Sequence, residues 1–257
     1  MSYRRFNNKS NYRRKRVKGY RGRSGPSIPR ALMKDSHELK YFDYKDSQTD
    51  IKKDATWSSA KNELWPTNHT CCAIPTGGGV TQRNGSRAWL KSMDVRIRVS
   101  VPFEVLPLAS TNSGQDITVQ IIIFLDTANN GSAAHPSAQD ILDCKTATDA
   151  QSLQCMRNMT KTLQYKVLRK YTVRLSPEVW ADSTNSHSPN MDRYITDRIN
   201  LHWLELNFDS DVTKSGQQDS LMNNAIFGIV NSNYQTSMTA TWEPDVYSNI
   251  RLRFVDT

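Results

Sequence analysis

Acidic residues are missing from the start of this chain. The first thirty residues contain no Asp or Glu, and the first acidic residue is Asp35. The same thirty residues hold eleven of the 34 Lys and Arg residues. They are Arg4, Arg5, Lys9, Arg13, Arg14, Lys15, Arg16, Lys18, Arg21, Arg23 and Arg30. The rest of the chain has 23 basic and 25 acidic residues, so the formal charge of +9 divides into +11 and −2.

A segment with this charge and no counter-charge binds a polyanion, since each phosphate contact releases counterions. Unpaired bases can stack on its four aromatic residues, so we expect it to bind single-stranded nucleic acid. These aromatic residues are Tyr3, Phe6, Tyr12 and Tyr20. The run Arg13–Arg16 is sufficient for a nuclear localisation signal, which is an alternative use of the arm and is compatible with the first.

Glycines and the lack of apolar periodicity mark the same segment as an arm. Gly19, Gly22 and Gly25 interrupt it, and no apolar face recurs along it. We therefore expect residues 1–36 to be a flexible arm that binds nucleic acid and import receptors. Residues 37–257 are long enough for one large domain.

Long apolar runs are also absent. The longest, Ile117–Leu125, contains Thr118 and Gln120 and is too short to span a bilayer, so no membrane insertion is expected. Cysteine is scarce, and the four residues Cys71, Cys72, Cys144 and Cys155 form no C-x-x-C pair. We expect four reduced thiols. A zinc site at His69, Cys71 and Cys72 would need a fourth ligand that the sequence does not supply, so no metal and no cofactor are expected.

No set of catalytic residues is recognisable, which predicts that the chain is not an enzyme. Gly77–Gly79 lacks the Gly-Lys that completes a phosphate-binding loop and indicates a turn. His202 lies beside Trp203 in an expected strand, which favours a packed or interface residue over a general base. The five histidines are dispersed, at positions 37, 69, 135, 187 and 202. Three carboxylates that could hold a divalent cation lack a ligand spacing and favour capping or solvated roles; they are Asp126, Asp140 and Asp143.

Apolar and polar residues alternate over much of the remainder, which predicts β-strands. Met93–Val101 alternates without exception, so one face should be buried while the other carries Arg96 and Arg98. Ile117–Leu125 is apolar on both faces, which is typical of a central strand covered on both sides. Further strands are expected over residues 39–44, 165–175, 199–208, 225–231 and 249–255.

Irregularities in the pattern predict the connections. The apolar parity of 199–208 switches after Trp203, which indicates a bulge or a bend between sheets. One short helix is expected over residues 138–143 with Ser137 as its cap. Long loops should cover 45–83, 126–163, 176–198 and 209–224. We therefore expect an all-β fold, a single jelly-roll sandwich of about eight strands in two sheets.

Seven features in a fixed order resemble capsid proteins of eukaryotic circular single-stranded DNA viruses, the group of geminiviruses, genomoviruses and circoviruses. The first is the basic arm, and the others are Leu39–Asp43, Gly79–Gly85, Lys91–Met93, Ile121–Asp126, Tyr165–Lys170 and Ile250–Phe254. The resemblance runs from about residue 38 to the C-terminus. Asn84 stands where these capsids usually carry an aliphatic residue, and the arm is shorter than in typical geminiviruses, so the family within the group is left open.

The resemblance implies a jelly-roll subunit that assembles into a small icosahedral shell, most simply of sixty copies, with a twinned particle as the variant. It places the arm inside, on a single-stranded DNA genome, and the protein in the virion and the host nucleus. Two alternatives stay open, the capsid protein of a small RNA or satellite virus and a non-viral nucleic-acid-binding protein.

Basic residues on the expected strands extend the candidate nucleic-acid surface beyond the arm. Arg96 and Arg98 are its first members. Five more stand at comparable positions, namely Lys166, Lys170, Arg174, Arg251 and Arg253. For each of them alone, a salt bridge or a solvent-facing position is the competing interpretation.

Overall fold

The computed structural model describes residues 39–49, 51, 63–101, 117–129, 131, 135–143, 153, 155–175, 192–211, 213, 215–233 and 244–256. All of them belong to a unit that runs from His37 to Thr257. The eleven arm cations and the import motif Arg13–Arg16 lie outside the described residues, so the expectations about them stay predictions.

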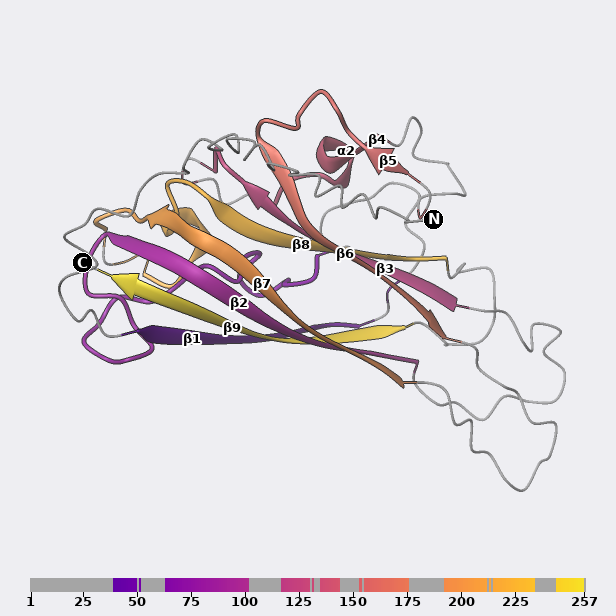
Figure 1. Cartoon of the computed structure of the whole chain (residues 1–257), viewed down its shortest axis with the longest axis horizontal. Coiled ribbons are helices and arrows are strands. Elements are labelled where there is room, and N and C mark those ends of the chain that lie inside the picture. Colours follow the sequence, from indigo (N-terminus) through magenta and orange to yellow (C-terminus); the bar gives the residue numbers. More distant parts are fainter. Residues whose placement is uncertain are drawn as a thin grey trace, which may run out of the picture. The chain divides into compact units, whose positions relative to one another are not determined.

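The first of two main sheets has four antiparallel strands (Figure 1). In spatial order these are β1 (Lys40–Gln48), β9 (Asp245–Asp256), β2 (Arg87–Ser100) and β7 (Asp192–Asn207). The strands next to one another here are distant in sequence, since the two ends of the domain pair as β1 and β9. The first and last strands of the domain are therefore held together in one sheet.

The second sheet contains β6 (Tyr165–Leu175), β3 (Ile117–Asp126) and β8 (Ala225–Ser232), again antiparallel and in that order. On the other side of β8, Glu63 forms an antiparallel bridge with Ile229. The segment at Glu63 therefore stands in the place of a fourth strand.

The strand order identifies the fold. Counted along the chain with the Glu63 segment as the second of eight, the strands follow the order 1-8-3-6 in one sheet and 2-7-4-5 in the other. This interleaving of two antiparallel sheets is that of a jelly roll. The predicted fold class, an all-β jelly-roll sandwich, is confirmed.

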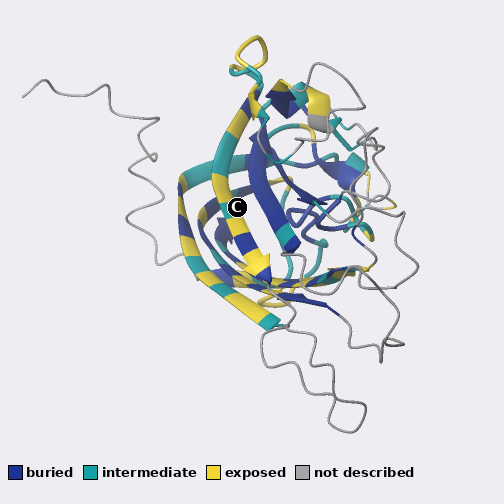
Figure 2. Ribbon diagram, turned by 90° about the vertical axis from the view of Figure 1, so that its right-hand side faces the viewer, coloured by how far each residue is buried: buried dark blue, intermediate teal, exposed yellow. Residues whose placement is uncertain are grey.

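Alternation along β2 sets which side chains enter the core. Met93, Val95 and Val99 have no exposed surface, whereas Arg96 and Arg98 between them are exposed. Successive side chains of a strand point to opposite faces, so one face of this sheet is apolar and the other is polar and carries Arg96 and Arg98. Figure 2 shows the resulting stripes of buried and exposed residues.

Strand β3 is covered on both faces, as its sequence predicts. Phe124 stacks on Phe227 with ring centroids 5.7 Å apart and meets His135 edge-on at 6.3 Å. The Gln120 side-chain amide donates to the Leu153 carbonyl at 2.8 Å. The segment that supplies His135 and Leu153 also contains α2 (Ala138–Ile141), β4 (Leu142–Asp143) and β5 (Met156–Arg157). Figure 1 shows these three elements on the side of the second sheet that faces away from the first.

The parity switch in 199–208 is a β-bulge. Leu204 pairs with Leu90 and Asn200 with Ser92, so three residues of β7 lie opposite the single residue Lys91. His202 and Trp203 absorb the extra length with φ of 50° and 62°. The predicted irregularity is confirmed as a bulge within one strand. His202 is exposed in the single chain, so of the two predicted positions, packed or at an interface, the interface stays a prediction.

Several predicted boundaries were wrong. Residues 192–198 belong to β7 and not to a loop, because an edge strand with one open face can be polar at most positions. The helix ends at Ile141, and Leu142–Asp143 form a short ladder with Met156–Arg157. Its cap is confirmed, since the Ser137 hydroxyl accepts a hydrogen bond from the backbone of Gln139 at 3.3 Å.

The expectation of four reduced cysteines was also wrong. Cys71 and Cys72 are free and fully buried, whereas Cys155 is disulfide-bonded. Cys144, the chain's remaining cysteine, lies outside the described residues. Disulfide formation depends on how close the fold brings two Cα atoms, which spacing in sequence does not reveal. Within the described residues, no helix is long and apolar enough to cross a membrane.

Candidate nucleic-acid interface

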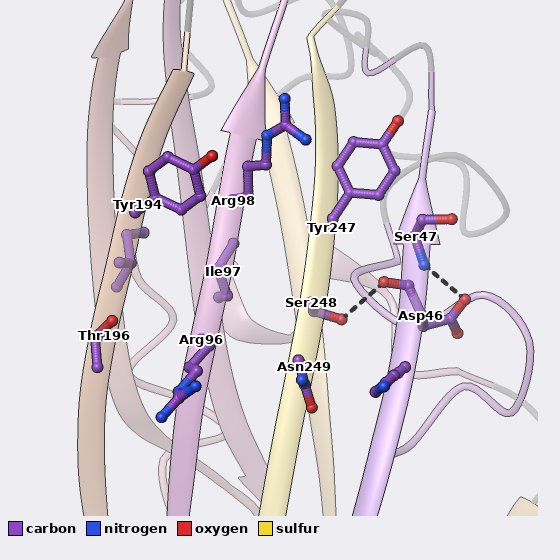
Figure 3. A pocket seen from close by; sticks show the side chains of 12 residues that line it. Asp46, Ser47, Arg96, Ile97, Arg98, Tyr194, Thr196, Tyr247, Ser248 and Asn249 are labelled. Atoms are coloured by element: carbon purple, nitrogen blue, oxygen red, sulfur yellow. Dashed lines mark hydrogen bonds between the residues drawn. The ribbon is translucent and has the colours of Figure 1, made fainter.

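Arg96 and Arg98 lie on the solvent-facing side of the four-stranded sheet, which we call the outer face. The antiparallel register sets the residues of this face in rows that cross the strands. Within a row, neighbouring side chains are about 5 Å apart, and rows follow one another at roughly 7 Å along a strand. Two rows contain the predicted residues (Figure 3).

The first row is aromatic and cationic. Arg98 pairs with Tyr247 of β9 on one side and with Tyr194 of β7 on the other. The Arg98 guanidinium lies 5.8 Å from the centre of the Tyr247 ring. Ser47 of β1 completes the row. Arg98 therefore stands between two aromatic rings, which Figure 3 shows projecting from the same side of the sheet.

The second row carries cations without carboxylates. It runs from Lys45 through Asn249 and Arg96 to Thr196. Both Lys45 and Arg96 are exposed. No carboxylate of the described part of the chain forms an ion pair with either of them, so both positive charges are available to a ligand.

The third row is neutralised internally. Arg251 makes a bidentate ion pair with Asp43, at 2.6 and 2.7 Å, and this hydrogen-bonded guanidinium lowers the pKa of Asp43. Asp94 lies 3.5 Å from Arg198 and 3.0 Å from Arg253 of the next row. For Arg251 and Arg253, the interpretation as salt-bridge partners is therefore the better one.

Arg98 is intermediate between these two cases. Its guanidinium donates to Asp192 at 2.8 Å, and this hydrogen bond raises the pKa of Arg98. Both side chains are well exposed, at 46% and 38%, so water screens the pair and it contributes little to stability. An incoming phosphate can share or replace Asp192.

The two rows border an open hollow of about 640 Å³ (Figure 3). Short side chains at Thr196 and Asn249 leave the space between the larger ones. Ile97 is 2% exposed with its side chain in the core, so it contributes only backbone to the floor. The hollow is a shallow depression across strands, suited to an extended ligand.

Exposed tyrosines are concentrated on this face. Among the described residues, three tyrosines are more than a third exposed: Tyr41 at 38%, Tyr194 at 73% and Tyr247 at 41%. All three project from the outer face of the one sheet. Tyr41 differs from the other two because it lies beside the ion pair of Arg251 and Asp43. The Arg251 guanidinium lies 4.8 Å from the centre of the Tyr41 ring. Solvent-facing aromatic side chains of this number are a feature of binding surfaces.

The basic residues of β6 do not join this surface. Lys166, Lys170 and Arg174 are exposed, but they stand on the second sheet. Arg169 of the same strand forms an ion pair of 2.9 Å with Asp197 of β7 and so links the two sheets at their edge. The basic strand residues thus fall into a surface at Arg96 and Arg98, a salt-bridged set and a separate β6 set.

The motif Gly79–Gly85 has a structural role that its sequence does not indicate. Arg83 is 3% exposed, lies 4.0 Å from the Phe208 ring and donates to the carbonyls of Ile74 (3.2 Å) and Gly85. Because burial penalises its charge, the pKa of Arg83 is lowered. Arg83 is followed by the polar residue Asn84, and nothing in this local sequence indicates that the Arg83 side chain is buried.

Two other motifs meet the same corner of the domain. Lys40 donates to the Gln82 carbonyl and to Asp256, both at 3.1 Å. The Asn84 backbone also donates to Asp256, at 2.5 Å. The first strand, the motif Gly79–Gly85 and the last strand are therefore joined through one buried ion pair.

Two of the candidate metal ligands, His69 and Asp140, bond to other side chains. His69 bonds Glu63 at 2.5 Å instead of approaching the buried thiols of Cys71 and Cys72. Asp140 pairs with Lys161. Among the described residues, no group of three or more His, Cys, Asp or Glu side chains is placed to hold a metal ion. Gly77 forms part of a turn, where its backbone donates to the Arg83 carbonyl at 2.9 Å.

No protein-family model and no curated protein sequence matches the chain. Solved structures that match include the empty particle of Kashmir bee virus at acidic pH, with 9% identity, a TM-score of 0.32 and coverage of 100% of this chain and 84% of the other. Desmodium yellow mottle tymovirus matches with 8% identity, a TM-score of 0.29 and coverage of 90% and 95%. A semi-empty virus-like particle of the giant freshwater prawn (Macrobrachium rosenbergii) nodavirus matches with 12% identity, a TM-score of 0.22 and coverage of 97% of this chain and 98% of the other. The strand order, and not these distant likenesses, carries the fold assignment.

Proposed function

We propose that this chain is a viral capsid protein without enzymatic activity, which self-assembles into a small icosahedral shell and packages circular single-stranded DNA. The observation that carries the proposal is the division of charge. An arm of +11 precedes a jelly-roll domain whose outer face presents Lys45 and Arg96, which form no ion pair with any described residue. Such a subunit has one part to bind a polyanion and another to pack against copies of itself.

The arms bind the genome tightly because many of them act together. Each arm binds phosphates through counterion release, a weak and sequence-independent contact that salt suppresses. When sixty copies stand in a closed shell, their arms act on one polymer, and the effective concentration makes the combined binding strong. Packaging therefore needs no tight site on a single subunit.

The arm also contains a nuclear localisation signal. The run Arg13–Arg16 fits recognition by nuclear import receptors of the host, which agrees with assembly in the nucleus and with a mature location in the virion. Nucleic-acid binding and import use the same cations at different stages, so the two roles do not compete.

Nuclease protection tests this proposal. The full-length protein is produced in cells and fractionated, and the fractions are treated with nuclease before nucleic acid is extracted. The proposal predicts a large assembly that holds nuclease-resistant nucleic acid, with DNA enriched in cells that replicate a circular single-stranded genome. Exclusive recovery of RNA from those cells would identify the alternative capsid class. A monomer or small complex with no protected nucleic acid would identify a non-viral binding protein.

A further inference from the structure

We propose that the hollow on the outer face is a binding site for single-stranded nucleic acid in which bases stack on Tyr194 and Tyr247 while Arg96 and Lys45 hold phosphates. The inference rests on the proposed function and deepens it, because it gives the folded domain a contact with the genome that is independent of the arm. It names two tyrosines and one lysine that no sequence pattern singled out.

The rings are the first argument. Tyr194 and Tyr247 stand on either side of Arg98, two strands apart, and so roughly 10 Å from each other. They are 73% and 41% exposed, so the flat faces needed for stacking are open to a ligand. Base–aromatic stacking accepts any base, which suits a protein that must cover a whole genome.

The placement of the cations is the second argument. Lys45 pairs with Asn249, the second residue after Tyr247, and Arg96 pairs with Thr196, the second residue after Tyr194. Lys45 is therefore a diagonal neighbour of Tyr247, and Arg96, which also pairs with Asn249, is a diagonal neighbour of both tyrosines, at about 7–8 Å. A cation therefore adjoins each ring, which is the arrangement expected for a nucleic-acid strand that lays successive nucleotides across β1, β9, β2 and β7.

Charge distribution is the third argument. Further along the same face, Asp43 and Asp94 neutralise the arginines, and a phosphate there would meet carboxylates. Within the three rows described above, and among the residues that the structure describes, Lys45 and Arg96 are the cations that form no ion pair. Stacking requires exposed base faces, which a duplex hides, so the occupant is a single strand.

Photo-crosslinking of the full-length wild-type protein tests the site directly. The probes are oligo(dT) and oligo(U) that carry 5-iodo-pyrimidines, and mass spectrometry maps the crosslinked peptides. The proposal predicts crosslinks at Tyr194 or Tyr247 in addition to any in the arm. The two probes distinguish DNA from RNA as the preferred strand, since stacking alone uses no 2′-hydroxyl.

Binding at high salt, where contacts of the arm are screened, supplies the second measurement. Each ring that is lost should raise the Kd for oligo(dT) by a factor of at least about 5, and the double variant Tyr194→Leu/Tyr247→Leu loses both. Tyr41→Leu is the matched control, an exposed tyrosine of the same face beside neutralised charge, and should bind as the wild type does. Arg96→Gln should lower the salt dependence of binding, whereas Arg253→Gln should not.

Crosslinks confined to residues 1–36, together with unchanged binding by the double variant, would overturn the site while leaving the proposed function standing. Protection of both tyrosines by a neighbouring copy would give that same result. Failure of the wild-type protein to bind either probe, or to hold protected nucleic acid, would overturn the proposed function as well.

Discussion

Arg83 has a structural role that its residue type does not indicate. In the sequence it is one more cation, but in the fold it is a buried side chain that bonds two backbone carbonyls and stacks on Phe208. Its charge is stabilised by these carbonyl dipoles and by the nearby Asp256. An apolar replacement would leave the carbonyls of Ile74 and Gly85 without their donor.

We expect Arg83→Met to lower the free energy of unfolding by about 2–4 kcal/mol. The control is Arg87→Met, because Arg87 is exposed and reaches Glu205 only at 4.0 Å; it should change stability by less than about 0.5 kcal/mol. Urea denaturation followed by circular dichroism measures both. Equal effects of the two substitutions would refute the structural role of Arg83.

His135 predicts a dependence of stability on pH. It packs against Phe124 and Phe227, and burial lowers its pKa to about 4. The unfolded chain, with a His pKa near 6.5, binds more protons than the folded one between about pH 4 and 6.5, so stability falls as the pH drops through this window.

His135→Phe should remove this dependence, which amounts to about 3 kcal/mol in total. His202→Asn is the control, since His202 is exposed and Asn tolerates its left-handed backbone. The measurement is the urea midpoint at pH 7 and pH 4.5 for the wild type and both variants. An unchanged loss of stability in His135→Phe would show that other groups cause it.

Among the elements, those with strong patterns could be predicted from the sequence, and those with weak patterns could not. Strand β6 begins and ends where its alternation does, at Tyr165 and Leu175. The first half of β7 was missed because it is an edge strand whose residues face solvent on one side and carry charge on the other. The ladder of β4 and β5 has two residues per strand, too few for any periodicity.

The candidate site divides in the same way. Arg96 and Arg98 could be placed on one exposed face because parity along a single strand is local. Their neighbours Tyr194, Tyr247 and Lys45 come from three other strands, and only the cross-strand register brings them together. Register is set by the whole fold, so this part of the surface could not be derived from the sequence.

Strand β3 provides a test of which residues hold the element in the core. Ile122 is 2% exposed, so Ile122→Asp would bury a charge without a partner at a cost of several kcal/mol, comparable with the stability of a whole domain. We expect loss of soluble, folded subunits. Arg96→Asp, at an exposed position that forms no ion pair with the described residues, should fold normally. Circular dichroism and sedimentation decide the matter, and a folded Ile122→Asp would contradict the assignment of faces.

At the scale of the whole molecule, we propose that the domain assembles and that the arm binds the genome. Deletion of residues 1–30 removes all eleven arm cations and none of the described strands. The truncated protein should fold, lose nuclear import and hold little protected nucleic acid. A full-length variant with the eleven cations replaced by Gln separates charge from length and should behave in the same way. Packaging of full-length DNA by either protein would disprove this division.

The central claim is that the chain builds a closed shell, and electron microscopy of the purified full-length protein with light scattering tests it most directly. We expect uniform closed particles, with a protein mass near sixty times the 29.3 kDa of one chain, roughly 1.8 MDa. A population of monomers or small complexes at every protein and salt concentration, with no closed particle in the images, would contradict it.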